Sequence, residues 1–224
     1  MCMPIEVETK DCTALSDVEL AEMADLGGDG SHRFEIGQLS KQAEAWVLVA
    51  IAKETDKVKG FTFFTLERIG GTPSVLIGPG AVKRTAKRDS VLKTIIQEQM
   101  RRAVLAFPDE DVLVGSRFDN AGGFEAYKTL HDVVPRPDHK ASGEERAWGR
   151  RLAKRFGIEV SEYEDRVFVA RGDGTVPCVL AHASAKPEKI KPEVVAFFDD
   201  LDMVRGDVLI AFGWAKAEDL LKLT

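Results

Sequence analysis

Two short stretches of this chain carry side chains whose type and spacing could do chemistry. In KRTAKRD (83–89), four cationic side chains precede a long segment with helical apolar spacing. A helix N-terminus attracts anions, so a basic loop at that place can hold a phosphate group. In FDNAGGFEAYKTL (118–130), Tyr127 follows Asn120 by seven residues, and a phenol can donate a proton in general acid catalysis. The two stretches therefore indicate anion binding and proton transfer.

Each stretch also has a plain structural interpretation. The basic loop can be a solvated surface loop. Tyr127 can be a half-buried aromatic side chain that anchors a helix end, and Asn120 can cap a helix or form a turn after a strand. The choice depends on the elements that position these residues.

The apolar pattern predicts an α/β protein with a mixed sheet. Strands are expected at 4–9, 45–52, 58–67, 72–80 and 111–116, and helices at 16–26, around 37–44 and at 89–107. The link KETDK between the second and third strands predicts an antiparallel hairpin. The helix 89–107 joins the fourth strand to the fifth as a crossover, which makes those two strands parallel.

The Pro-rich, polar segment 134–143 predicts a boundary between two parts, residues 1–137 and 138–224. Beyond it we expect a helix at 144–156, a hairpin at 166–182 around the turn GDG, a helix from Pro192, a strand at 207–213 and a short terminal helix, AEDLLKL. This smaller C-terminal part is either a second α/β unit or an extension of the same sheet.

The composition limits the classes of function. With 44% hydrophobic and 30% charged residues the chain is an ordinary globular protein. Its formal charge of −6 argues against a broad nucleic-acid-binding surface, and no apolar run has the length of a membrane span. Three cysteines without CxxC spacing and four histidines without ligand spacing predict no metal site and a reducing, cytoplasmic location.

Residues 4–137 resemble the GCN5-related N-acetyltransferase (GNAT) superfamily in the order of their elements and in three passages. KVKGFTFFTLE (57–67) resembles the second strand of the family's hairpin. GPGAVKRTAKRDSVL (78–92) resembles the strand, loop and helix that hold the pyrophosphate of coenzyme A. The stretch 118–130 is similar to the family's Asn after its fifth strand and Tyr seven residues later.

The chain departs from the family pattern at two places. Arg84 matches the first position of the loop motif Arg/Gln-x-x-Gly-x-Gly/Ala, but Lys87 and Asp89 replace its glycines. Side chains there crowd the approach to a phosphate, and an Asp at a helix start competes with an anion for the free N–H groups. After the Tyr, His131 and Asp132 stand where the family has Gly-Phe.

The resemblance implies an acyl-CoA-dependent N-acyltransferase that uses acetyl-CoA or another acyl-CoA, without a metal, to acylate a small-molecule or peptide amine. In the family the Tyr protonates the departing thiolate, so Tyr127 and the adjoining Asn120 are the implied catalytic residues. The implied cofactor-binding residues are Leu76, Gly78, Gly80, Arg84, Lys87, Arg88 and Ser90.

A second function stays open, that of a non-catalytic GNAT-fold binding or regulatory protein that has lost coenzyme A binding. The replaced glycines favour it. So does the strand 72–80, which has no acid to serve as a base, leaving Glu67 as a substitute. Its partner would be another protein, and a homodimer is considered for either function. An open cleft between the two parallel strands would favour the enzyme. A cleft filled by Lys87, by Asp89 or by the C-terminal part (138–224) would favour the binding protein.

Overall fold

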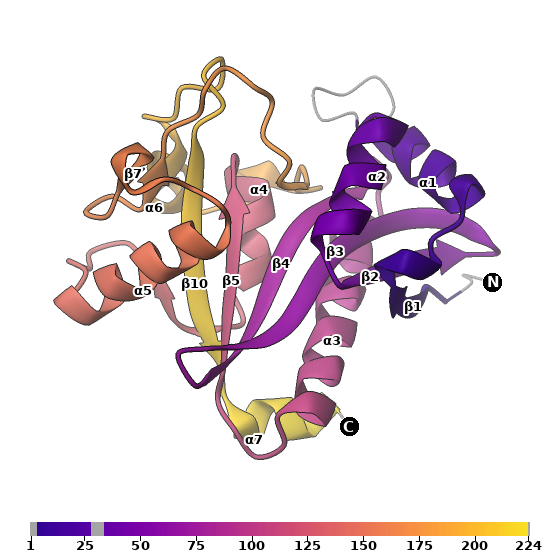
Figure 1. Ribbon diagram of the computed structural model, residues 1–224, viewed down its shortest axis with the longest axis horizontal. Coiled ribbons are helices and arrows are strands. Elements are labelled where there is room, and N and C mark those ends of the chain that lie inside the picture. Colours follow the sequence, from indigo (N-terminus) through magenta and orange to yellow (C-terminus); the bar gives the residue numbers. More distant parts are fainter. Residues whose placement is uncertain (1–3, 28–33, 224) are drawn as a thin grey trace.

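The computed structural model describes residues 4–27 and 34–223, so Cys2 and His32 lie outside the described part. A mixed sheet runs through the molecule, with helices on both faces (Figure 1). Its strands are β1 (Glu6–Asp11), β2 (Leu48–Glu54), β3 (Lys57–Ile69), β4 (Thr72–Val82), β5 (Val112–Phe118), β6 (His131–Val134), β7 (Tyr163–Glu164), β8 (Val169–Ala170), β9 (Leu180–Ala181) and β10 (Val208–Ala215).

The helices lie between groups of these strands along the chain. They are α1 (Asp17–Ala24), α2 (Ile36–Ala45), α3 (Arg88–Ala106), α4 (Ala121–Phe124), α5 (Gly143–Arg155), α6 (Pro192–Val195) and α7 (Ala217–Leu220). Single 3-10 turns extend α4, α6 and α7; these are η3 (Glu125–Tyr127), η6 (Ala196–Phe198) and η7 (Leu221–Leu223). The helix predicted from Pro192, PEVVAFFDDLDM (192–203), is shorter in the structure, where α6 and η6 end at Phe198. No helix in the described ranges has both the length and the apolar character that a bilayer span needs.

The strand order is β1-β2-β3-β4-β5-β10-β8-β7. The first four strands are antiparallel neighbours, β4 and β5 are parallel, and β10 returns antiparallel to β5. Two short strands lie off this path, because β6 pairs with β10 and β9 pairs with β4. The expected α/β fold, a mixed sheet flanked by helices, is confirmed.

The core lies on both faces of the sheet because successive side chains of a strand point to opposite sides. On β3, Phe63 packs with α1 and α2, whereas the next residue, Phe64, packs in the core under α3. The apolar face predicted for α3 is buried as expected. Its members are Leu92, Ile95, Ile96, Met100, Ala103, Val104 and Phe107.

The C-terminal part contributes to the same sheet. β10 lies against β5 along its whole length, from Leu209 opposite Phe118 to Ala215 opposite Val112. The strands of both parts are thus hydrogen-bonded neighbours, and the boundary at 137/138 as a division into folding units stays a prediction.

The predicted hairpin at 166–182 is wrong. The turn exists, with Gly174 at a φ of 93°, but the two arms do not pair with each other. β8 pairs with β7 and β10, whereas β9 pairs with β4. The local pattern correctly indicates that both arms contain strands. The first arm pairs with the nearby β7 and the distant β10, and the second arm pairs with the distant β4.

Candidate functional site

The two parallel strands separate near the middle of the sheet. Their pairing runs from Ser74 opposite Leu113 to Ile77 opposite Ser116. The Ser116 hydroxyl donates to the Ile77 carbonyl at 2.8 Å, and this is the last link before β4 and β5 diverge. The resemblance assigns the pantetheine arm of coenzyme A to this gap.

The chain itself fills the gap. We call residues 178–185 the closing segment; its strand β9 runs parallel to β4, with Leu180 opposite Gly80 and Ala181 opposite Ala81. The Gly80 N–H donates to the Val179 carbonyl at 3.2 Å. Leu180 is completely buried. The backbone donor expected to bind a cofactor is therefore already used within the protein.

The basic loop and the start of α3 hold the other end of the closing segment. Arg88 donates to the carbonyls of Ala183 (2.5 Å) and Ser184 (2.7 Å). Asp89 accepts the Ala185 N–H at 2.9 Å, and its Oδ1 lies 3.0 Å from His182 Nε2. These two residues, which would adjoin a bound pyrophosphate in the family, bind a peptide segment here.

The charges at this junction are balanced internally. Burial on its own would raise the pKa of the Asp89 carboxyl, but the Ala185 N–H, His182 and Arg88 outweigh it and hold that pKa below its ordinary value. Burial lowers the pKa of His182 despite the nearby carboxylate, so the neutral imidazole is favoured. The Nδ1 atom of His182 is buried without a hydrogen-bond partner in the described part of the chain.

Tyr127 lies in η3 and is 1% exposed. Its ring packs edge-on against Phe118, with 4.9 Å between ring centres. Burial raises the pKa of Tyr127 well above its ordinary value, and Ser116 opposes part of the shift. The phenol oxygen makes no hydrogen bond of normal geometry to the described residues. Tyr127 thus carries a neutral phenol whose pKa is affected by Ser116 of β5, and a catalytic role for it stays a prediction.

Asn120 caps α4. Its Oδ1 accepts the Gly123 N–H at 2.9 Å, and its amide donates to Asp119 at 2.6 Å. This geometry is the capping interpretation considered from the sequence. Any further, catalytic role of Asn120 is a prediction that the capping geometry does not address.

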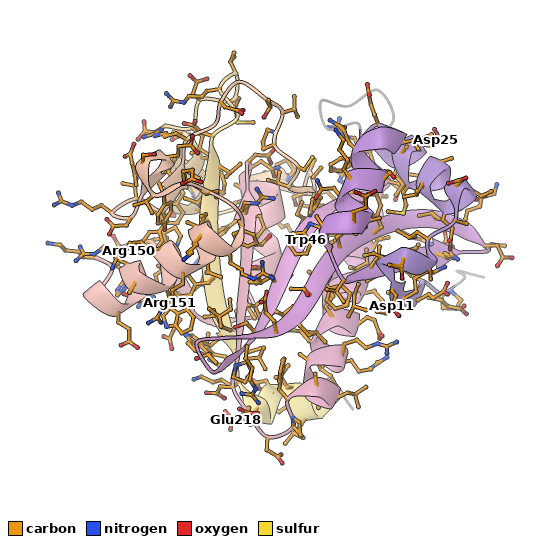
Figure 2. All side chains as sticks on the ribbon, in the orientation of Figure 1. Asp11, Asp25, Trp46, Arg150, Arg151 and Glu218 are labelled. Carbon is orange, nitrogen blue, oxygen red and sulfur yellow. The ribbon has the colours of Figure 1, made fainter. Side chains whose placement is uncertain are left out.

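The remaining predicted cofactor-binding residues lie along β4 and the following loop. Leu76 is buried opposite Gly115. At Gly78 an added Cβ would lie 2.5 Å from the ring of Trp46, so this glycine makes room for the indole labelled in Figure 2. Lys87 pairs with Glu54 at 2.6 Å.

Three further residues mark the edges of this region. Arg84 is exposed in the basic loop, and Ser90 is exposed in the first turn of α3. Glu67, considered from the sequence as a substitute base, pairs with Arg155 of α5 at 2.9 Å. Its place on β3, in the ladder opposite Ser74, puts it before the point where β4 and β5 part.

Two hollows adjoin the closing segment. The larger, which we call the α3 groove, has a volume of ≈ 570 Å³ and is lined by residues of α3, η3 and α7. The smaller, of ≈ 410 Å³, is lined by the end of β4, by α4 and by residues 181–195. Gly122, His182 and Ser184 line both hollows.

Sequence reasoning allowed for a cleft filled by the C-terminal part but did not identify the closing segment. The apolar run before His182 indicated a strand, but nothing local indicated its partner. A signal was present at Gly122, where an added Cβ would lie 2.7 Å from the His182 carbonyl and 2.8 Å from the Ser184 nitrogen. The glycine is needed by the neighbouring segment, and a lone sequence does not show which segment that is.

Comparisons with known proteins found likeness in structure alone. No protein-family model and no curated protein matches the sequence. The ribosomal-protein-S18-alanine N-acetyltransferase from Escherichia coli is 8% identical, with a TM-score of 0.49 over 94% of this chain and 95% of that one. The IAA acetyltransferase from Bacillus cereus ATCC 14579 is 13% identical, with a TM-score of 0.39 over 58% and 80%.

A GNAT family acetyltransferase from Brucella melitensis, solved in complex with acetyl-CoA, is 18% identical, with a TM-score of 0.35 over 50% of this chain and 75% of that one. Identities this low leave the likeness a matter of fold.

Proposed function

We propose that this chain is a non-catalytic binding protein built on an acyltransferase-like fold, in which the closing segment takes the place of the coenzyme A arm. The observation that carries the proposal is the pairing of β9 with β4 at Gly80 and Ala81. A pantetheine arm would need the same edge of β4 and the same space between the strands.

The burial of the closing segment makes it a part of the core. Val179 is 2% exposed and Leu180 is 0% exposed. Burying each such side chain contributes about 1.5–3 kcal/mol, so withdrawing both costs about 3–6 kcal/mol before any hydrogen bond is counted. The open form would then be about one molecule in 10² to 10⁴, and the apparent affinity for coenzyme A would fall by the same factor.

Asp89 supports the same proposal from the side of the cofactor. The family loop leaves the start of its helix free for a pyrophosphate, whereas here a carboxylate stands there and receives the Ala185 N–H. A phosphate brought to this place would meet a fixed negative charge. Asp89, the residue that weakens an anion site at this place, is thus also the residue that binds the closing segment.

The test is calorimetric titration with acetyl-CoA and with free coenzyme A, at low and moderate salt. The proposal predicts no binding at micromolar strength in either buffer. Micromolar binding that is lost in Arg84→Ala, but kept in the control Lys154→Ala on α5, would contradict it. Low salt matters because attraction between the basic loop and phosphates is strongest there.

A second candidate is the acyl-CoA-dependent N-acyltransferase itself. It is favoured by the buried phenol of Tyr127, whose oxygen makes no hydrogen bond of normal geometry among the described residues. In that reaction the substrate amine would attack the thioester carbonyl, the C–S bond would break, and Tyr127 would give its proton to the departing thiolate. The new amide nitrogen would lose one proton to solvent, and solvent would return a proton to Tyr127. The closing segment would first have to leave the gap between β4 and β5.

Thiol release from acetyl-CoA with a panel of small-molecule and peptide amines tests this candidate. Tyr163→Phe is the matched control, since it removes the chain's other phenol. The enzyme hypothesis predicts thiol release that is abolished in Tyr127→Phe and preserved in Tyr163→Phe. Absence of release with every amine, or equal release by both variants, would remove it.

A further inference from the structure

The α3 groove has the size and lining of a small-molecule site. Its volume of ≈ 570 Å³ lies within the range of ligand pockets. The floor is apolar, and its members are Leu92, Ile96, Met100, Leu130 and Leu220. An apolar floor in a hollow of this size favours a ligand with a hydrocarbon body.

The acids of the groove are already paired. Asp89 contacts His182 at 3.0 Å, Glu125 lies 3.7 Å from Lys128, and Asp219 contacts His131 at 2.8 Å. A cationic ligand that binds one of these carboxylates would therefore compete with the partner that this carboxylate already has.

Among the described residues, one lysine that lines the groove has no partner. Lys216 pairs with Asp111 at 2.9 Å, whereas Lys93 has no ion pair or hydrogen bond within the described ranges. Ser90 and Gln97, about one turn before and after Lys93 on α3, also line the groove, and their side chains have no hydrogen-bond partner in the described part. The unmatched charge is positive and has two uncharged polar neighbours, an arrangement that suits a carboxylate.

We propose that the α3 groove binds an organic carboxylate with an apolar chain, its headgroup at Lys93 and its chain along the floor formed by Leu92, Ile96 and Met100. This inference rests on the proposed binding function and names its ligand class. The proposed headgroup and floor residues lie on α3, away from the pairing of β4 with β9, and the closing segment contributes His182 and Ser184 to the groove lining, so the groove can bind this ligand while the closing segment is in place.

The test is calorimetric titration with hexanoate, octanoate and decanoate, and with octanol and octylamine as uncharged and cationic controls. Each added methylene should tighten binding about three- to fourfold as long as the floor still accepts it. Octanoate should bind at least tenfold more tightly than octanol or octylamine. Lys93→Ala should weaken octanoate binding at least tenfold, and Lys154→Ala on α5 should leave it unchanged.

Charge reversal gives the sharpest readout. Lys93→Glu should lose octanoate and gain octylamine. Since Lys93 is exposed, both variants should keep the fold, which circular dichroism checks. No octanoate binding, equal binding of octanoate and octanol, or full binding in Lys93→Ala would each overturn the inference.

Titration of the same samples with coenzyme A tests the proposed function separately from the carboxylate site. Binding of coenzyme A between the strands contradicts the proposed function even if octanoate binds. If neither coenzyme A nor octanoate binds, the proposal of a closed gap is still supported and only the carboxylate site is refuted.

Discussion

Gly122→Ala places one methyl group between α4 and the closing segment. The added Cβ would lie 2.7 Å from the His182 carbonyl and 2.8 Å from the Ser184 nitrogen. Both contacts are with backbone atoms, so no side-chain rotation relieves them. Either the closing segment or the start of α4 must move.

Two effects of opposite sign set the magnitude. Replacing Gly by Ala inside a helix stabilises it by up to about 1 kcal/mol. Overpacking against fixed neighbours costs about 1–3 kcal/mol. We expect the second to win, with a net decrease of about 1–2 kcal/mol in the free energy of unfolding. For a domain of this size, each kcal/mol lowers Tm by about 2–4 °C.

Urea unfolding monitored by circular dichroism measures this change. Gly143→Ala is the matched control, because it lies in the first turn of α5 and an added Cβ there meets nothing within 4 Å. The control should be neutral or slightly stabilising. If Gly122→Ala proves as stable as Gly143→Ala, the closing segment does not press on α4 and the reasoning fails.

Two further predictions concern stability. Leu180→Ala should lower the free energy of unfolding by about 2–4 kcal/mol, because the side chain is fully buried. The control Leu105→Ala, at a 70% exposed position, should change it by less than about 0.5 kcal/mol. Equal effects of the two variants in urea titrations would contradict the burial of β9. Asp207→Asn should cost about 1–3 kcal/mol at neutral pH. The hydrogen bonds from Arg205, with those from Arg171, hold the Asp207 pKa far below its ordinary value. The stabilising effect of the Asp207 carboxylate is therefore complete above about pH 4 and is lost as pH falls toward the folded-state pKa. A difference in unfolding free energy between wild type and variant that does not shrink between pH 7 and pH 3 would refute this.

Much of the sheet was predictable because its signals are local. Helical spacing in 89–107 predicted α3, and a helix between two apolar strands predicted the parallel pair β4 and β5. The links that were predicted correctly join neighbours in the sequence. They needed only periodicity and the handedness of a crossover.

The closing segment could not be predicted, because its partners are distant in the sequence. Asp89 at a glycine position indicated a weakened anion site, and that was visible from the loop motif. What Asp89 binds, Ala185, stands 96 residues further along the chain. The GDG turn likewise predicted a local hairpin, while the free edge of β4 beyond Ile77 offered β9 a better-buried partner. Pairing across such distances depends on the assembled sheet.

The most direct test of the central claim is amide hydrogen exchange at Gly80. Its N–H donates to the Val179 carbonyl of the closing segment at 3.2 Å. If that segment is part of the core, Gly80 should exchange only through global unfolding, with the same opening free energy and denaturant dependence as the amides of β5. Exchange at Gly80 through a low-energy, denaturant-independent opening would show that the segment leaves the gap readily, and would contradict the account.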